Sequence, residues 1–156
     1  MNEILSLLSE RTVGDAYSSD GTFAVNLSSL APGLRAMAAT HWLDISLTLD
    51  SITWHFGNFG EPGLVALTEA GLTELGMDDL AQCFREARDL MVPLLENRTA
   101  EGGDPYEILE REGLEERGDE LDKRAWDVNV PGHSSSAIYN AWIRYARAYP
   151  ENVFAS

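Results

Sequence analysis

The apolar residues in the middle of the chain recur at steps of four, three, four and three, which strongly constrains the fold. They are Leu80, Phe84, Ala87, Met91 and Leu94. A helix turns once in about 3.6 residues, so this spacing gathers all five side chains along one face. The pattern predicts an amphipathic helix that Asp78 or Asp79 caps and in which Pro93 kinks or shortens the last turn.

The same spacing of three and four residues recurs along much of the chain. It predicts a helix over residues 1 to 12, one long helix after Ser29 that reaches Phe56, a short helix over residues 62 to 75, and a last helix from Ser136 to Tyr149 that Pro150 ends. Pro32 falls in the first turn of the long helix, where its missing N–H is not needed. Asp104 and Glu107 have the spacing of a capping box, which predicts a further helix start. Gly113 and Gly118 are expected to break the stretch that follows.

A chain of 156 residues is long enough to form one domain with a buried core. Alternation with a period of two, which would indicate strands, is scarce outside residues 22 to 28. We therefore expect an all-α fold, a single-domain helical bundle. Residues 1–30 are expected to form an N-terminal helix and loop arm, with the loop over residues 13 to 27, and residues 31–156 the all-α domain. A second loop is expected over residues 97 to 103.

Residues 50 to 62, DSITWHFGNFGEP, crowd aromatic side chains and glycines together. We call six of these residues the corner: Trp54, Phe56, Gly57, Asn58, Phe59 and Gly60. Glycine and asparagine adopt left-handed or tight backbone conformations more readily than other residues, so a sharp turn between two helices is expected. The aromatic side chains are expected to anchor this turn in the core. A pocket for a small ligand is the alternative.

Acidic residues far outnumber basic ones: 26 Asp and Glu against 11 Lys and Arg give a net charge of −15. Such a chain repels nucleic-acid phosphates and anionic membranes, and it attracts a basic protein surface. Between Glu101 and Asp127 there are 11 acids and 4 bases, a net charge of −7. Eight acids of this stretch are the candidate partner-binding residues: Glu107, Glu110, Glu112, Glu115, Glu116, Asp119, Glu120 and Asp122.

Carboxylates at this density fit two interpretations. One is a solvated helix surface that only keeps the protein soluble. The other is imitation of DNA, which presents about one negative charge per 1.7 Å, because acids every two to four residues on several helices approach that density. We therefore expect an acidic interaction protein without enzymatic activity that binds a basic protein, with DNA mimicry as the sharper hypothesis. An immunity or antitoxin protein that neutralises a basic toxin is the alternative.

The sequence offers little support for catalytic or metal chemistry. The three histidines and the single cysteine, Cys83, lack the spacing of a zinc site, so we expect no metal or cofactor and a core position for Cys83. His41, Asp44 and His55 give a second alternative, a small hydrolase, because carboxylates with histidine can perform acid–base catalysis. No signal peptide and no apolar stretch of bilayer length is evident, so we expect a cytoplasmic protein that contacts neither membranes nor nucleic acid directly.

Several short motifs follow one another along the chain. They are HFGNFG (55–60), GLTELGM (71–77), LAQCFREARDLM (80–91), ELDKRAW (120–126) and WIRYARAYPENVF (142–154). Over roughly residues 34 to 155 they resemble a bacterial all-α domain family of unknown function, one of whose member types is a small acidic DNA-mimic protein. The chain departs from the family pattern at residues 50–53, where Asp-Ser-Ile-Thr replaces Asn-Gly-Gly-Phe. The resemblance implies a homodimer whose target is a transcription regulator or another DNA-binding protein.

Overall fold

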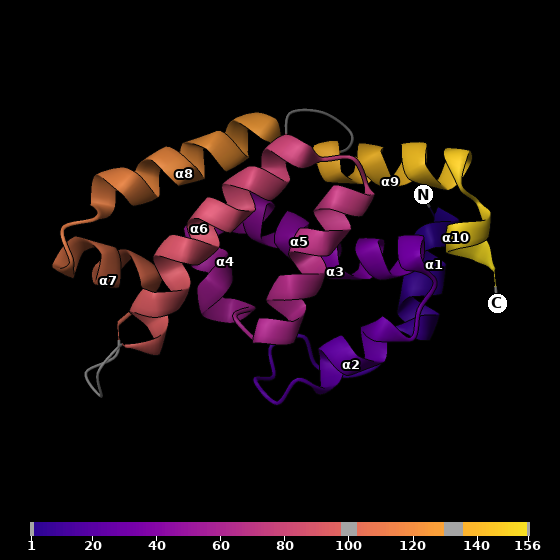
Figure 1. The fold of residues 1–156 in the computed structure, drawn as a ribbon, viewed down its shortest axis with the longest axis horizontal. Helices are drawn as coiled ribbons and strands as arrows, with labels where there is room; N and C mark the ends of the chain where they lie inside the picture. The colour runs from indigo at the N-terminus through magenta and orange to yellow at the C-terminus, as the bar shows by residue number, and fades with distance from the viewer. Residues whose placement is uncertain (1, 98–102, 130–135, 156) are drawn as a thin grey trace.

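The computed structural model describes residues 2–97, 103–129 and 136–155 (Figure 1). These residues form ten α-helices and no strand, which confirms the all-α helical fold. The helices are α1 (Asn2–Arg11), α2 (Thr22–Ser28), α3 (Pro32–Leu49), α4 (Ile52–Asn58), α5 (Pro62–Glu74), α6 (Asp78–Glu96), α7 (Pro105–Arg111), α8 (Glu115–Val128), α9 (Ala137–Ala148) and α10 (Glu151–Phe154).

Helix α3 runs through the middle of the molecule and contacts α5, α4, α9 and α10. Its buried residues lie on all sides and include Leu34, Met37 and Leu43. A helix that is buried all round belongs to the core, and its polar groups must then find partners inside the protein. The Thr40 hydroxyl, for example, donates to the Ala36 carbonyl at 2.8 Å. The other helices are therefore arranged around α3.

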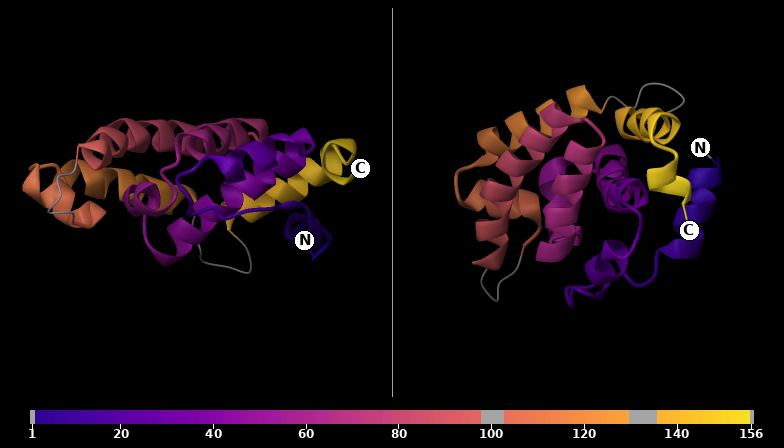
Figure 2. Two further views of the ribbon diagram at one scale, coloured as in Figure 1. Left: turned by 90° about the horizontal axis from the view of Figure 1, so that it is seen from below. Right: turned by 45° about the vertical axis from the view of Figure 1, so that its right-hand side comes forward.

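The two ends of the molecule have different helices (Figures 1 and 2). Helices α7 and α8 form one end, where α8 lies along α6, and α1, α9 and α10 form the other. One continuous apolar core joins them, and the first thirty residues contribute Ile4, Leu8, Phe23 and Leu27 to it. The N-terminal residues are thus packed against the same core as the rest of the chain.

The single long helix expected to reach Phe56 is wrong, because α3 ends at Leu49 and α4 begins at Ile52. Ser51 between them has an extended backbone, and its Oγ accepts a hydrogen bond from the Trp54 N–H at 3.2 Å. A serine in this position caps a new helix. The apolar spacing continues across the break, so periodicity alone did not reveal it.

One glycine-based expectation also fails, and one proline-based expectation is only part of what the structure has. Gly118 does not break a helix but lies inside α8, where a Cβ would come 2.7 Å from Cδ1 of Leu109 in α7. Its missing side chain lets α7 and α8 approach each other. Pro150 ends α9 as expected, but the chain resumes as the short helix α10.

Two further expectations concern helix starts. The loop expected over residues 13 to 27 contains most of α2, which begins after Gly21 at a φ of 82°. The N-cap of α6 is Met77, without a side-chain cap, while Asp78 and Asp79 lie in its first turn, where their charges favour the helix dipole. Pro93 lies within the last turn of α6.

Other starts are as expected. The capping box of α7 is confirmed, since the Glu107 N–H donates to Asp104 Oδ1 at 2.9 Å. Ser136 caps α9 by accepting from the Tyr139 N–H at 3.2 Å. Most of the loop expected over residues 97 to 103 lies outside the described residues.

The corner forms the end of α4 and leads into α5, which begins at Pro62, and its backbone does not use the left-handed conformation. Gly57 lies within the helix, Asn58 ends it and Phe59 is its C-cap. None of the six corner residues has a positive φ. Phe56 and Phe59 are buried in the core, and Trp54 is half-buried. The aromatic side chains thus hold an ordinary helix end against the core.

Gly60 has a steric role that its φ does not show. A Cβ at this position would lie 2.5 Å from the Phe56 carbonyl oxygen, a backbone atom that cannot move aside alone. We expect Gly60→Ala to lower the free energy of unfolding by about 1–3 kcal/mol, as overpacking does. Urea denaturation measures this, with the exposed neighbour Asn58→Ala as a control that should stay within about 0.5 kcal/mol. A Gly60→Ala protein with parental stability but weakened binding would instead make the corner a functional loop.

Candidate protein-interaction surface

Helices α7 and α8 and the turn between them carry most of the predicted partner-binding residues at the surface. Seven of the eight are exposed, and we call them the acidic face: Glu107, Glu110, Glu112, Glu115, Glu116, Asp119 and Glu120. Both helices lie at the same end of the molecule (Figure 1). The structure therefore brings these seven carboxylates onto neighbouring elements.

The arginines of α8 are paired with a carboxylate outside the acidic face. Glu86 of α6 accepts from Arg117 at 3.0 Å and from Arg124 at 2.6 Å, which lowers the pKa of Glu86 to about 2. Arg117 also pairs with Glu120 at 2.9 Å. Within the described residues no ion pair involves the other acids around this pair, Glu112, Glu115, Glu116 and Asp119. The two arginines of α8 are thus already paired with carboxylates of the protein.

Asp122, the eighth predicted residue, has a different position. It is half-buried, its Oδ1 accepts from the Thr53 N–H at 3.0 Å, and its Oδ2 accepts from the Thr53 hydroxyl at 3.1 Å. Burial raises the pKa of this carboxyl, and the two hydrogen bonds from Thr53 oppose that rise. Asp122 therefore fastens the start of α4 to α8 and is not part of the acidic face.

A hollow of about 390 Å³ lies beside Asp122, and we call it the aromatic hollow. Two large rings border it, Tyr106 with 45% and Trp126 with 49% of the residue exposed. The full lining is Leu47, Asp50, Ser51, Tyr106, Asp122, Lys123 and Trp126. The sequence did not point to this site, although a tryptophan among the charges of KRAWD was a signal for an exposed ring.

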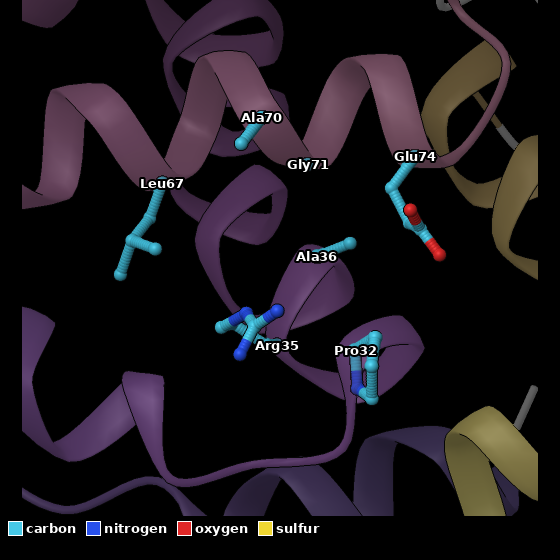
Figure 3. A pocket seen from close by; sticks show the side chains of 7 residues that line it. All are labelled: Pro32, Arg35, Ala36, Leu67, Ala70, Gly71 and Glu74. Atoms are coloured by element: carbon cyan, nitrogen blue, oxygen red, sulfur yellow. The ribbon is translucent and has the colours of Figure 1, made fainter.

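The hollow between α3 and α5 is much smaller, about 90 Å³ (Figure 3). It exists because the two helices pack closely: a Cβ on Gly71 would lie 3.1 Å from the Ala36 Cα. The polar groups at its rim are engaged elsewhere, since Glu74 accepts from the Tyr145 hydroxyl and Arg35 donates to a carbonyl of α2 at 3.4 Å. Ligand pockets measure about 300–1,000 Å³, so this seam is too small for one.

A third hollow, of about 370 Å³, borders the corner. It is lined by corner residues together with Tyr17, Val92 and Leu95. The Glu61 carboxylate at its edge already accepts from the N–H groups of Gly63 and Leu64 at the start of α5. A specific ligand site needs polar groups that converge on the cavity, and this carboxylate is committed to the helix cap.

The structure does not gather the three residues of the hydrolase alternative in one open site. His55 is 1% exposed and its Nδ1 lies 2.7 Å from Ser46 Oγ. Asp44 is 4% exposed and accepts from Asn129 Nδ2 at 3.0 Å. Burial lowers the pKa of His41 despite the nearby charge of Asp44. These side chains make separate contacts that join α3 to α4 and to the end of α8.

Cys83 is buried, as expected for a core residue, and burial raises the pKa of its thiol. In the part of the chain that the structure describes, no three His, Cys, Asp or Glu side chains group as metal ligands would. None of the helices described here has both the length and the apolar character to cross a membrane.

A family model with the description "DMP19-like protein" matches residues 28–146. The chain belongs to the DMP19-like family. The family relationship expected from the short motifs is thereby confirmed. The DMP19-like segment spans α3 to α8 and most of α9, so it includes both the acidic face and the aromatic hollow, while α1 and α10 lie outside it. No curated protein and no solved structure matches the chain.

Proposed function

We propose that this DMP19-like protein binds a basic protein through its acidic face and occupies that partner's nucleic-acid-binding surface, as a DNA mimic does. One observation carries the proposal. Seven exposed carboxylates lie on α7, α8 and the turn between them, while Glu86 holds the arginines Arg117 and Arg124. An outward field of one sign is what attracts and orients an oppositely charged surface.

The spacing of charge along α8 supports mimicry over a merely soluble surface. Six of its 14 residues are acids, and five remain exposed when Asp122 is left out. At a rise of about 1.5 Å per residue this is roughly one exposed carboxylate per 4 Å of helix, close to the ~3.4 Å between charges on one DNA strand. Helix α7 adds Glu107 and Glu110 beside it.

The proposed function is binding without catalysis. The acidic face consists of carboxylates on helix surfaces, and the buried pairs around His55 and Asp44 are not open to a substrate. The proposal also includes a cytoplasmic location and the homodimer that the family resemblance implies.

Reversing the charge of the acidic face should abolish most of the affinity for the partner. In the variant Glu112→Lys, Glu115→Lys and Glu116→Lys, three exposed carboxylates become cations, so both the attraction and the steering of the encounter are lost. We expect the dissociation constant to rise at least about tenfold, the equivalent of about 1.4 kcal/mol, chiefly through slower association. The measurement is surface plasmon resonance over a salt series with a basic protein captured from the host at low salt.

A charge-matched control is available at the opposite end of the molecule. Glu3, Glu10 and Glu151 are also exposed, and their reversal to lysine changes the net charge by the same amount (Figure 1). This control should bind within about threefold of the parent, because exposed charges are screened over about 8 Å at physiological salt. Equal affinities and salt slopes for parent and acidic-face variant would overturn the proposal. Duplex DNA should displace the protein from the partner; a toxin neutralised without such competition would favour the immunity alternative.

A further inference from the structure

The aromatic hollow lies where three elements meet beside the acidic face. The end of α3 contributes Asp50, α7 contributes Tyr106, and α8 contributes Asp122 and Trp126. The Tyr106 ring is held in place, because its hydroxyl lies 2.7 Å from Ser51 Oγ and its centroid 5.1 Å from that of Trp54. Half-exposed aromatic rings on so charged a surface form an apolar site within a strongly negative field.

The charges around the hollow do not balance. Lys123 is paired with Asp127 at 2.7 Å, and Asp122 accepts both hydrogen bonds from Thr53 at the positive N-terminal end of α4. Asp50 has no ion pair within the described residues: it is exposed and follows α3, whose last turn contains no basic residue. The negative end of α3 and the positive end of α4, which begins after Ser51, act on Asp50 in opposite directions, so the charge of Asp50 itself is left for a cation.

We propose that the aromatic hollow receives one arginine side chain of the basic partner, whose guanidinium stacks on Trp126 and pairs with Asp50. This inference rests on the proposed function and specifies a part of it. A volume of about 390 Å³ is within the range of small-ligand sites, so it has room for one long side chain. The local excess of negative charge provides the complementarity.

The chemistry of the hollow favours arginine over lysine. A guanidinium is planar and weakly hydrated, stacks on the face of tryptophan or tyrosine, and pairs with a carboxylate through two parallel hydrogen bonds. A lysine ammonium is a compact and strongly hydrated charge that gains less from an aromatic wall. With Trp126 and Tyr106 on its border and Asp50 at its edge, the hollow offers the partners that a guanidinium uses.

A direct test needs no natural partner. The probes are the capped tripeptide Gly-Arg-Gly and the same peptide with citrulline or lysine in place of arginine, titrated into the full chain. The readout is the indole N–H resonance of Trp126, assigned by its loss in Trp126→Phe. We expect the arginine peptide to shift this resonance in a saturable way, the lysine peptide to bind about three- to fivefold more weakly, and the uncharged citrulline peptide to have no comparable effect.

The variants locate the site. Asp50→Asn should weaken binding of the arginine peptide about fivefold, whereas Glu10→Gln, an exposed acid of α1 outside the lining, should leave it unchanged. Both positions are exposed, so both proteins should fold normally. Equal shifts from the arginine and citrulline peptides, or equal affinity of parent and Asp50→Asn, would overturn the inference. If the peptide result fails while acidic-face reversal still abolishes partner binding, the hollow is excluded and the proposed function stands. A positive peptide result with unaltered partner binding after reversal overturns the proposed function alone.

Discussion

Acidification to about pH 4.5 should cost the fold about 3 kcal/mol through His55 alone, and the loss should approach about 4 kcal/mol near pH 3. Burial lowers the pKa of this ring from 6.5 to about 3. Between these two pH values His55 is therefore protonated in the unfolded chain and neutral in the folded protein. The stability contributed by neutral His55 is complete above pH 6.5 and is lost as the pH falls toward 3. Domains are stable by only about 5–15 kcal/mol, so the loss is large.

The contacts of His55 explain why its protonated form is unfavourable in the folded protein. The Ser46 hydroxyl donates to the Trp42 carbonyl at 3.1 Å, which leaves its oxygen to accept from His55 Nδ1–H at 2.7 Å. Within the described residues Nε2 has no hydrogen-bond partner. Protonation would place a charged N–H there, among the rings of Phe56, Phe59 and Phe84, with nothing to accept from it.

The test is urea denaturation of the parent and of His55→Asn at about pH 7.5 and pH 4.5. Asparagine can still donate to Ser46 Oγ but does not titrate, so its loss on acidification should be smaller than the parent's by about 3 kcal/mol. The quantity to compare is the difference between the two proteins in the change of unfolding free energy from pH 7.5 to pH 4.5. The change in one protein alone is not sufficient, because protonation of the many exposed carboxylates relieves repulsion in both. Parallel pH profiles would show that His55 does not govern acid stability.

Trp142→Ala should lower the free energy of unfolding by about 3–5 kcal/mol, the range for a large core aromatic. Trp142 is fully buried, its Nε1 donates to Thr40 Oγ1 at 3.0 Å, and its ring lies 4.8 Å from that of Tyr139. Removal of the indole leaves a cavity between α9 and α3 and takes away the hydrogen bond to the central helix. Urea denaturation at neutral pH measures the loss.

Trp126→Ala is the matched control, because the same side chain is removed from a position that is 49% exposed. We expect it to cost about 1 kcal/mol or less, since no core cavity forms. Equal losses for the two tryptophans would mean that α9 is not docked through Trp142.

Local signals in the sequence were sufficient to predict where several helices begin. The capping box at Asp104 and the start of the last helix at Ser136 are read from neighbouring residues, and the structure has both. The boundary between α3 and α4 was not predictable in the same way, because the apolar spacing is continuous and Ser51 is supported from elsewhere. Its Oγ meets the Tyr106 hydroxyl, a residue 55 positions away in sequence.

The same distinction between local signals and contacts distant in sequence applies to the candidate site. Exposure of the acids on α7 and α8 was expected from their charge, since a run of charged residues forms a solvated surface. Asp122 has the same neighbours in sequence, but it is half-buried because α4 begins against it, 69 positions away. Gly118 was misread because a glycine that breaks a helix and one that lets two helices touch look identical without the facing Leu109. The aromatic hollow could not be predicted, because its lining comes from three elements that are separate in the sequence, the end of α3, α7 and α8.

Glu86 of α6 pairs with two arginines of α8 and so influences the charge of the acidic face, to which α6 contributes no residue. Glu86 lies on α6, outside the acidic face, and pairs with both Arg117 and Arg124. A substitution there removes the partner of Arg124 and one of the two partners of Arg117, so the charge around the acidic face changes without a change in any residue of that face. A scan of the outward-facing acids alone would overlook this position. If the proposed function holds, a substitution on α6 changes the choice of partner while every carboxylate of the acidic face stays the same.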